Sequence, residues 1–185
     1  MITTPQIDER TAQPYLAIRT QVLMHALPTV IPQLLGEVFG WLGQQGIAPA
    51  GAPFIRYLVI NMEARMDIEV GVPVATAVPG DDRVCAGVLP AGRYATLIYT
   101  DVQRGIPANA ALLEWGAAQG LVWDTWAAEN GDGFGARLES FLTEPDEEPN
   151  PAKWETKVAI RLADEQPGER GATMPRTREH TRDGG

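Results

Sequence analysis

The sequence predicts an α+β domain made of two pseudo-symmetric β-α-β-β halves, with antiparallel sheets and a ligand pocket between the halves. Three observations support this prediction. The order strand, helix, strand, strand occurs twice along the chain, without obvious sequence identity between the copies. Several strand segments alternate apolar and polar residues, as strands with one covered face do. The 185 residues are enough to bury one core without disulfides or metals.

The first half contains four predicted elements. Residues 15–22 alternate as a strand. A helix follows, because apolar residues recur at helical spacing at Ile31, Leu34, Leu35, Val38 and Leu42. We expect Thr29 to open this helix and Gly46 to close it. Two more strands are predicted at residues 54–62 and 66–75.

The second half repeats this plan. Residues 84–89 lead through a Pro-Ala-Gly turn into a strand at 93–100. A helix is expected to begin at Pro107, since proline is favourable in the first turn, and to end at Gly120. Its apolar face is expected to carry Ala110, Leu113, Ala117 and Leu121. Cys85 is expected to be a small buried residue.

The last two strands are predicted at residues 136–143 and 154–162. Between the second helix and these strands lies a stretch rich in Trp and Gly, which we expect to be irregular. Trp123 and Trp126 belong to this stretch, so they are expected in a loop.

Glu139 is the first candidate site residue. In its strand it shares a face with Phe141, where an apolar side chain would be usual. A half-buried carboxylate among aromatic side chains is costly unless a partner arrives to pair with it. The alternative is a structural role, either as a solvated strand residue or in a salt bridge with Arg137 or Lys157.

Composition excludes several classes of function. The net charge of −9 repels phosphate backbones, so direct DNA binding is not expected. One cysteine excludes an internal disulfide, and two histidines are too few for a zinc site, so no cofactor or metal is predicted. The chain shows no signal peptide and no apolar run of transmembrane length, so we expect a cytoplasmic protein without membrane contact.

The chain is expected to divide into a domain at residues 1–164 and a disordered C-terminal tail at 165–185. The tail is rich in Pro, Gly, Arg and Thr and has almost no apolar residues to offset the entropy of ordering. Residues 1–13 are too short for a DNA-binding domain, which favours a stand-alone module.

Several segments match a known family in order and spacing. They are residues 51–57, 67–74, 89–95, 112–120, 138–145 and 154–158. Over roughly residues 5 to 163 the chain resembles the GyrI-like small-molecule-binding domain, also known as the effector-binding domain of multidrug-sensing transcription activators of the MerR and AraC types. The chain departs from the family pattern at Phe141, where many members have Tyr, at Lys157, where many have a second acid, and at Tyr99-Thr100-Asp101, which replaces a common His-containing turn.

The resemblance implies two pseudo-symmetric halves with a pocket between them, and a glutamate in the penultimate strand that meets cationic or aromatic ligands. Glu139 matches this glutamate, because it stands two residues before an aromatic residue and six before a proline. A lysine near the pocket, at Lys157, would offset part of its charge.

The further ligand-binding candidates are the expected pocket walls Tyr57, Trp123, Trp126 and Phe141, and the acid Glu69. Tyr57 is expected on the side of its strand that faces away from the helix. The leading hypothesis is a stand-alone binding protein for hydrophobic aromatic or cationic small molecules. It would sequester such compounds or sense them together with a separate partner.

Two other functions remain open. The resemblance also implies a hydrolase of strained electrophilic (cyclopropanoid) toxins, in which Glu139 acts as acid or base together with Tyr57 or Tyr99. A third possibility is a protein-interaction role, with gyrase as partner, in which the acidic surface or a sheet edge makes the contact.

Overall fold

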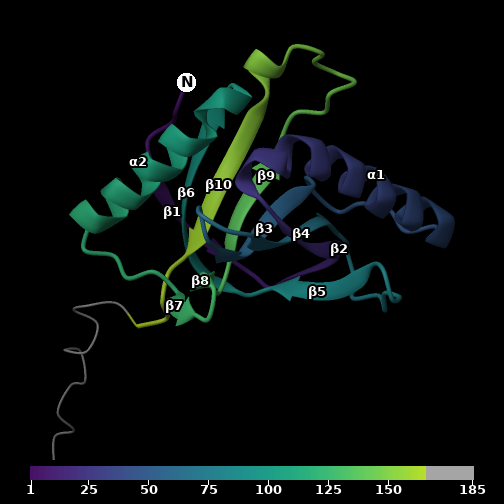
Figure 1. The fold of residues 1–185 in the computed structure, drawn as a ribbon, viewed down its shortest axis with the longest axis horizontal. Coiled ribbons are helices and arrows are strands. Elements are labelled where there is room, and N and C mark those ends of the chain that lie inside the picture. Colours follow the sequence, from purple (N-terminus) through teal and green to yellow (C-terminus); the bar gives the residue numbers. More distant parts are fainter. Residues whose placement is uncertain (166–185) are drawn as a thin grey trace, which may run out of the picture.

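A curled antiparallel sheet forms the centre of the fold, and two long helices cover one of its faces (Figure 1). The computed structural model describes residues 1–165, so the predicted tail lies outside it apart from Glu165. The strands and helices are β1 (Gln6–Arg10), β2 (Gln13–Val22), α1 (Leu27–Gln45), β3 (Phe54–Ile60), β4 (Met66–Pro73), β5 (Cys85–Leu89), β6 (Gly92–Thr100), α2 (Gly105–Ala118), β7 (Thr125–Ala128), β8 (Gly131–Phe134), β9 (Arg137–Phe141) and β10 (Glu155–Arg161). The α+β prediction is confirmed.

The sheet has an internal twofold pattern. The two halves are β2-α1-β3-β4 and β6-α2-β9-β10, and the strand order through the sheet is β6-β10-β9-β3-β4-β2. In each half the third strand lies between the first two, and β3 and β9 meet at the centre. The two predicted β-α-β-β units are therefore present as a pseudo-symmetric pair.

The outermost strands are exchanged between the halves. β1 precedes β2 in sequence but pairs with β6, whereas β5 precedes β6 but pairs with β2. Each half thus supplies a strand to the edge of the other half. β1 is not predicted from sequence, because Ile7 is its one apolar residue and no alternation is visible.

Helix α1 packs its apolar face on the first half. Its buried residues are Leu27, Leu34, Val38 and Leu42, which continues the predicted spacing. It ends at Gly46, whose φ of 68° is the left-handed conformation that glycine adopts without strain. The expected start at Thr29 is wrong, because the helix begins at Leu27 with Pro28 in its first turn and without a side-chain cap.

The face with which helix α2 covers the second half matches the predicted one only in part, since Leu113 and Leu121 are partly buried against the core beneath the helix. The buried residues are Ala108, Leu112 and Gly116, whereas Ala110 and Ala117 are exposed. Alanine and glycine occur all round this helix, so the apolar pattern does not reveal which side meets the sheet. Gly116 is buried because Trp123 packs against it; a Cβ there would lie 2.2 Å from the indole ring.

The stretch predicted to be irregular forms the hairpin β7-β8. β8 also extends the sheet, because Val59 of β3 pairs with Gly133. The expectation of a loop is therefore wrong. Two four-residue strands, the second with two glycines, are too short to show alternation.

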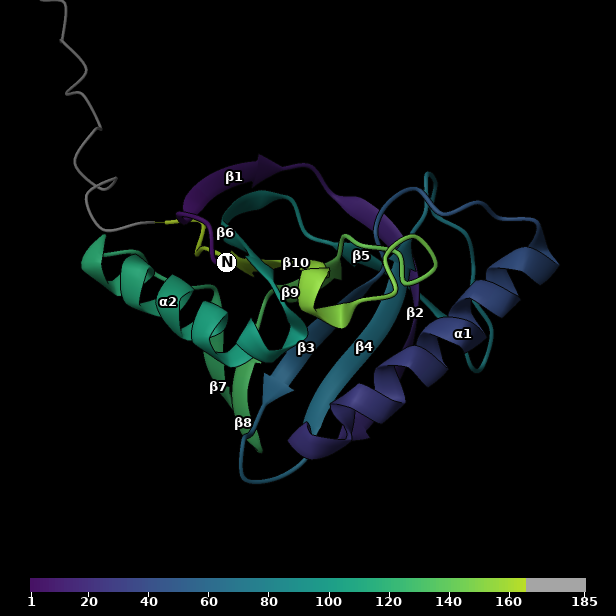
Figure 2. The ribbon, with the colours of Figure 1, turned by 90° about the horizontal axis from the view of Figure 1, so that it is seen from above.

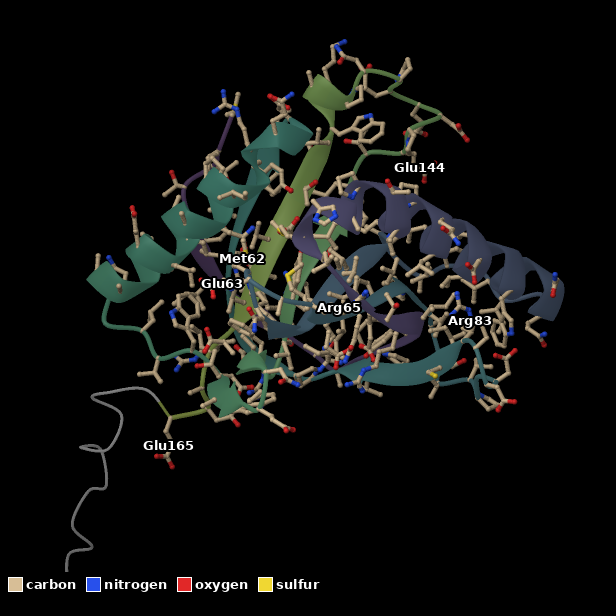
Figure 3. All side chains as sticks on the ribbon, in the orientation of Figure 1. Met62, Glu63, Arg65, Arg83, Glu144 and Glu165 are labelled. Atoms are coloured by element: carbon tan, nitrogen blue, oxygen red, sulfur yellow. The ribbon has the colours of Figure 1, made fainter. Side chains whose placement is uncertain are left out.

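The connection between β4 and β5 is held against α1. Arg83, labelled in Figure 3, lies in this connection. It donates to Glu37 of α1 through Nη2 at 2.7 Å and through Nε at 3.0 Å. Cys85, just beyond it, is exposed, so the expectation of a buried cysteine is wrong. As the first residue of an outer strand, it has few neighbours to cover it.

The buried side chains form three clusters, one beneath each helix and one on the opposite face of the sheet. The cluster under α1 includes Ile55, Ile68 and Val70, and the cluster under α2 includes Leu97 and Val158. The third cluster contains Tyr15, Ala17, Phe54, Leu89, Tyr94, Ala136, Leu138 and Ala159. Figure 2 shows the two helices apart, with β9 and β3 between them.

Candidate functional site

Glu139 lies at the centre of the pseudo-twofold pattern. It pairs with Ile55 of β3 on one side and with Val158 of β10 on the other. Residues directly opposite each other in neighbouring strands point to the same face. Because Ile55 belongs to the cluster under α1 and Val158 to the cluster under α2, the half-buried Glu139 side chain projects on the helix-covered face between the two clusters.

Two neutral donors bind the Glu139 carboxylate. The Tyr99 hydroxyl, at the end of β6, donates to Oε2 at 3.1 Å. The Asn109 side-chain amide, from the second turn of α2, donates to Oε1 at 2.8 Å. Because neither donor carries a charge, these bonds orient the carboxylate without neutralising it.

Arg137 supplies a nearby positive charge. Its Nη2 donates to the Asn109 Oδ1 at 2.9 Å, and its guanidinium carbon lies 4.9 Å from the centre of the Phe134 ring. Its Nε is buried and has no hydrogen-bond partner among the described residues. Burial lowers the pKa of Arg137, against the raising effect of Tyr57 and Glu139. Arg137, Asn109, Glu139 and Tyr99 therefore form one partly desolvated hydrogen-bond network.

Tyr57 and Tyr99 are both kept in their neutral form. Burial raises the pKa of Tyr57 well above its ordinary value, and the charge of Glu139 raises it further. Burial and Glu139 also raise the pKa of Tyr99. Both phenols therefore stay protonated at neutral pH and can donate hydrogen bonds.

Tyr57 packs in the cluster under α1, so the expectation that it faces away from the helix is wrong. A strand's side chains alternate, and Ile55 already faces α1.

Phe141 lies on the same face as Glu139, two residues further along β9. It packs partly buried against the cluster under α1, and its cross-strand partner is Thr156. Tyr57 and Phe141 stand two residues beyond Ile55 and Glu139, and β3 runs antiparallel to β9. The two aromatic rings therefore flank the central pair from opposite ends.

The structure places the other predicted residues elsewhere. Trp123 packs behind α2 against Gly116, and Trp126 lies on β7 with 52% of its surface exposed. Glu69 lies on the opposite face of the sheet, where it accepts from the Tyr15 hydroxyl at 2.5 Å. These three side chains are not brought together with Glu139.

Lys157 also points to the opposite face. It pairs with Ser140, the neighbour of Glu139, and its Nζ donates to Asp8 at 2.7 Å. The expected offset of the Glu139 charge thus has a nearer source, Arg137, which lies two residues away on the same face of β9.

Sequence reasoning did not identify Asn109 as a site residue, and it considered Arg137 only as a salt-bridge partner. A usable signal for Asn109 exists, because asparagine is unfavourable inside helices and here stands among alanines and leucines.

Within residues 1–165, no three His, Cys, Asp or Glu side chains are grouped as a metal site requires. Neither helix of this part of the chain combines the length and apolar character needed to cross a membrane.

Comparison with known proteins gives one family. Residues 3–163 match the model described as the GyrI-like small molecule binding domain. A search of curated proteins gave no match. Among solved structures, the C-terminal domain of EcmrR has a TM-score of 0.69 at 17% identity, with 88% of this chain and 98% of that chain covered.

EcmrR in its DNA complex has a TM-score of 0.70 at 16% identity, with 88% of this chain covered, and this chain spans only 58% of that one. SAV2435 bound to tetraphenylphosphonium has a TM-score of 0.55 at 8% identity, with 87% of this chain and 94% of that chain covered. A hydrolase from Listeria innocua has a TM-score of 0.57 at 11% identity, with 86% of this chain and 91% of that chain covered. At such identities these structures show a shared fold.

Proposed function

Because the chain belongs to the GyrI-like small-molecule-binding family, we propose that it binds hydrophobic aromatic or cationic compounds at Glu139. The observation that carries this proposal is the half-buried carboxylate between the two helix-covered halves, bound directly by neutral donors. Attraction between unit charges grows as the effective dielectric falls, so such a carboxylate favours a cation more than an exposed one does.

Aromatic side chains complete the proposed site. Tyr57 and Phe141 flank the carboxylate from the two ends, and Tyr99 binds it directly. Ring faces attract cations and stack on flat ligands. Arg137 limits the net negative charge, so we expect ligands whose positive charge is spread over a large apolar body rather than small, strongly hydrated cations.

The comparisons support this ligand class and a role in sequestering or sensing such compounds. SAV2435 is bound to tetraphenylphosphonium, a bulky apolar cation, and EcmrR is found in a complex with DNA. We infer that this protein sequesters such compounds in the cytoplasm, or senses them with a separate regulatory partner.

Titration calorimetry with tetraphenylphosphonium tests the proposal. Glu139→Gln keeps the shape of the side chain and removes its charge, so we expect binding to weaken by about tenfold or more, the effect of losing ~1.4 kcal/mol. Glu69→Gln, on the opposite face, is the matched control and should bind within about twofold of the wild type. Equal affinity of the wild type and Glu139→Gln, or no binding by the wild type, contradicts the proposal.

Hydrolysis of cyclopropanoid electrophiles is the second candidate, and the 3.1 Å contact between Tyr99 and Glu139 favours it. Glu139 would take a proton from the attacking water while a Tyr99 or Tyr57 phenol protonates the group that accepts the electrons of the broken ring bond. The Listeria innocua hydrolase lends support. A time course with a cyclopropanoid alkylator separates the two functions: a catalyst consumes many equivalents and loses turnover in Glu139→Gln, whereas a binder protects one equivalent.

A further inference from the structure

A pocket lies on the face of the sheet opposite Glu139. Its volume is about 470 Å³. It is formed where two connections approach the centre of the sheet, the one between β1 and β2 and the one between β5 and β6. We call it the crossover pocket and define it by Arg10, Phe54, Pro90, Leu138, Ser140 and Lys157.

The floor of the crossover pocket is apolar. Phe54 and Leu138 belong to the third buried cluster and lie on the two central strands, β3 and β9. Leu89, Pro90 and Leu142 extend this surface towards the rim. A pocket of a few hundred cubic ångströms with apolar walls and few polar groups is typical of small-molecule sites.

Arg10 provides unused hydrogen-bond donors at the pocket. Its guanidinium lies 4.8 Å from the centre of the Tyr94 ring, and its nearest carboxylate contact, with Asp8, is 4.0 Å long. The guanidinium donates no hydrogen bond to residues 1–165. Stacking on a ring holds the planar guanidinium in one orientation, which leaves its edge available for a carboxylate.

Two further donors line the same pocket. The Ser140 hydroxyl makes no hydrogen bond within the described part of the chain. Lys157 uses one of its three donors on Asp8, at 2.7 Å. Arg10, Ser140 and Lys157 therefore present donors above an apolar floor, in a protein whose net charge is strongly negative.

The acids near the pocket do not block an anion. Asp8 already accepts from Lys157, Thr96 and Gln6. Glu9 lies at the rim and is exposed, and strand alternation directs its side chain away from the face that carries Arg10. The donors thus outnumber the free acceptors on the inner side of the pocket.

We propose that the crossover pocket binds an amphipathic carboxylate, with its carboxylate on Arg10 and its apolar body on the floor formed by Phe54 and Leu138. Arginine pairs with carboxylates through two parallel hydrogen bonds, which adds geometric selectivity to the charge attraction. This site is separate from Glu139, because adjacent residues of β9 point to opposite faces. It also selects the opposite ligand charge.

Dodecanoate tests the proposal by titration calorimetry below its critical micelle concentration. Arg10→Gln should weaken binding by about tenfold, as expected for the loss of a charge-assisted pair. Ser140→Trp, which fills the pocket, should abolish binding. Glu139→Gln is the matched control and should leave dodecanoate affinity within about twofold. Circular dichroism and thermal melts establish that each variant is folded.

A neutral ligand with the same alkyl chain, dodecanol, provides a second measurement. Dodecanol should bind more weakly than dodecanoate to the wild type, and Arg10→Gln should not change its affinity. The proposal is overturned if the wild type does not bind dodecanoate, if Arg10→Gln binds it as well as the wild type does, or if Glu139→Gln alone removes binding. Tetraphenylphosphonium binding is measured on the same variants, so failure at one site is distinguished from failure at the other.

Discussion

At the scale of single residues, Asn109 connects α2 to the central strands. Its amide donates to Glu139 and to the carbonyl of Gly105, while its carbonyl accepts from Arg137. It thus provides hydrogen-bond partners to a half-buried acid and a half-buried base at once. An unsatisfied buried charge costs more than an ordinary hydrogen bond contributes, so this one side chain holds the network together.

We predict that Asn109→Leu lowers the free energy of unfolding by about 1–3 kcal/mol, because Glu139 and Arg137 each lose a partner in a partly buried place. Urea denaturation followed by circular dichroism measures the change. Ala110→Leu, one residue further along on the exposed side of α2, is the control and should stay within about 0.5 kcal/mol of the wild type. Equal stabilities of the two variants would show that the network is not needed for folding.

At the scale of elements, the two helices use glycine differently. Gly40 of α1 is exposed, and no atom lies within 4 Å of the position a Cβ would take. Gly116 of α2 is buried, and a Cβ there would meet the Trp123 ring. Glycine therefore only weakens α1, whereas in α2 it allows the helix to approach the indole closely.

Alanine substitutions should accordingly have opposite signs in the two helices. Gly40→Ala is expected to raise the free energy of unfolding by about 0.5–1 kcal/mol, because alanine loses less backbone entropy on folding. Gly116→Ala should lower it by about 1–3 kcal/mol through overpacking against Trp123. Thermal melts of both variants measure this, and each serves as the control for the other. A stabilising Gly116→Ala would disprove the close packing.

At the scale of the whole molecule, all four tyrosines are buried in the curled sheet. Burial raises the pKa of each of them above the ordinary value of 10.0; they are Tyr15, Tyr57, Tyr94 and Tyr99. The unfolded chain releases these protons near pH ~10, where the folded protein retains them. The stability they contribute is therefore complete below that pH and is lost as the pH rises further.

We predict that tyrosinate absorbance at 295 nm stays low above pH 10 until the protein unfolds, and that it then appears together with the loss of ellipticity. In concentrated urea the same groups should titrate near pH ~10. Smooth ionisation of even two tyrosines near pH 10, with the circular dichroism unchanged, would contradict the burial of these rings.

Much of the fold follows from local sequence patterns. Alternation located β2, β4, β6 and β10, helical spacing located α1, and glycine marked the ends of both helices. The α+β class, the two halves and the family followed from the order of these segments. For the candidate site, the sequence pointed to Glu139 as an acid on a face where an apolar residue is usual. It could do so because alternation is a property of one strand alone.

The tertiary structure decided which side chains meet. Glu139, Tyr99 and Asn109 come from three separate elements, and their contacts depend on the strand order and register, which no local pattern contains. The face that α2 buries, the β7-β8 hairpin and the placement of Trp123 and Glu69 away from Glu139 have the same origin. Sequence determined which segments could be strands or helices, because that depends on neighbours along the chain. Packing between distant segments determined the site, because it depends on neighbours in space.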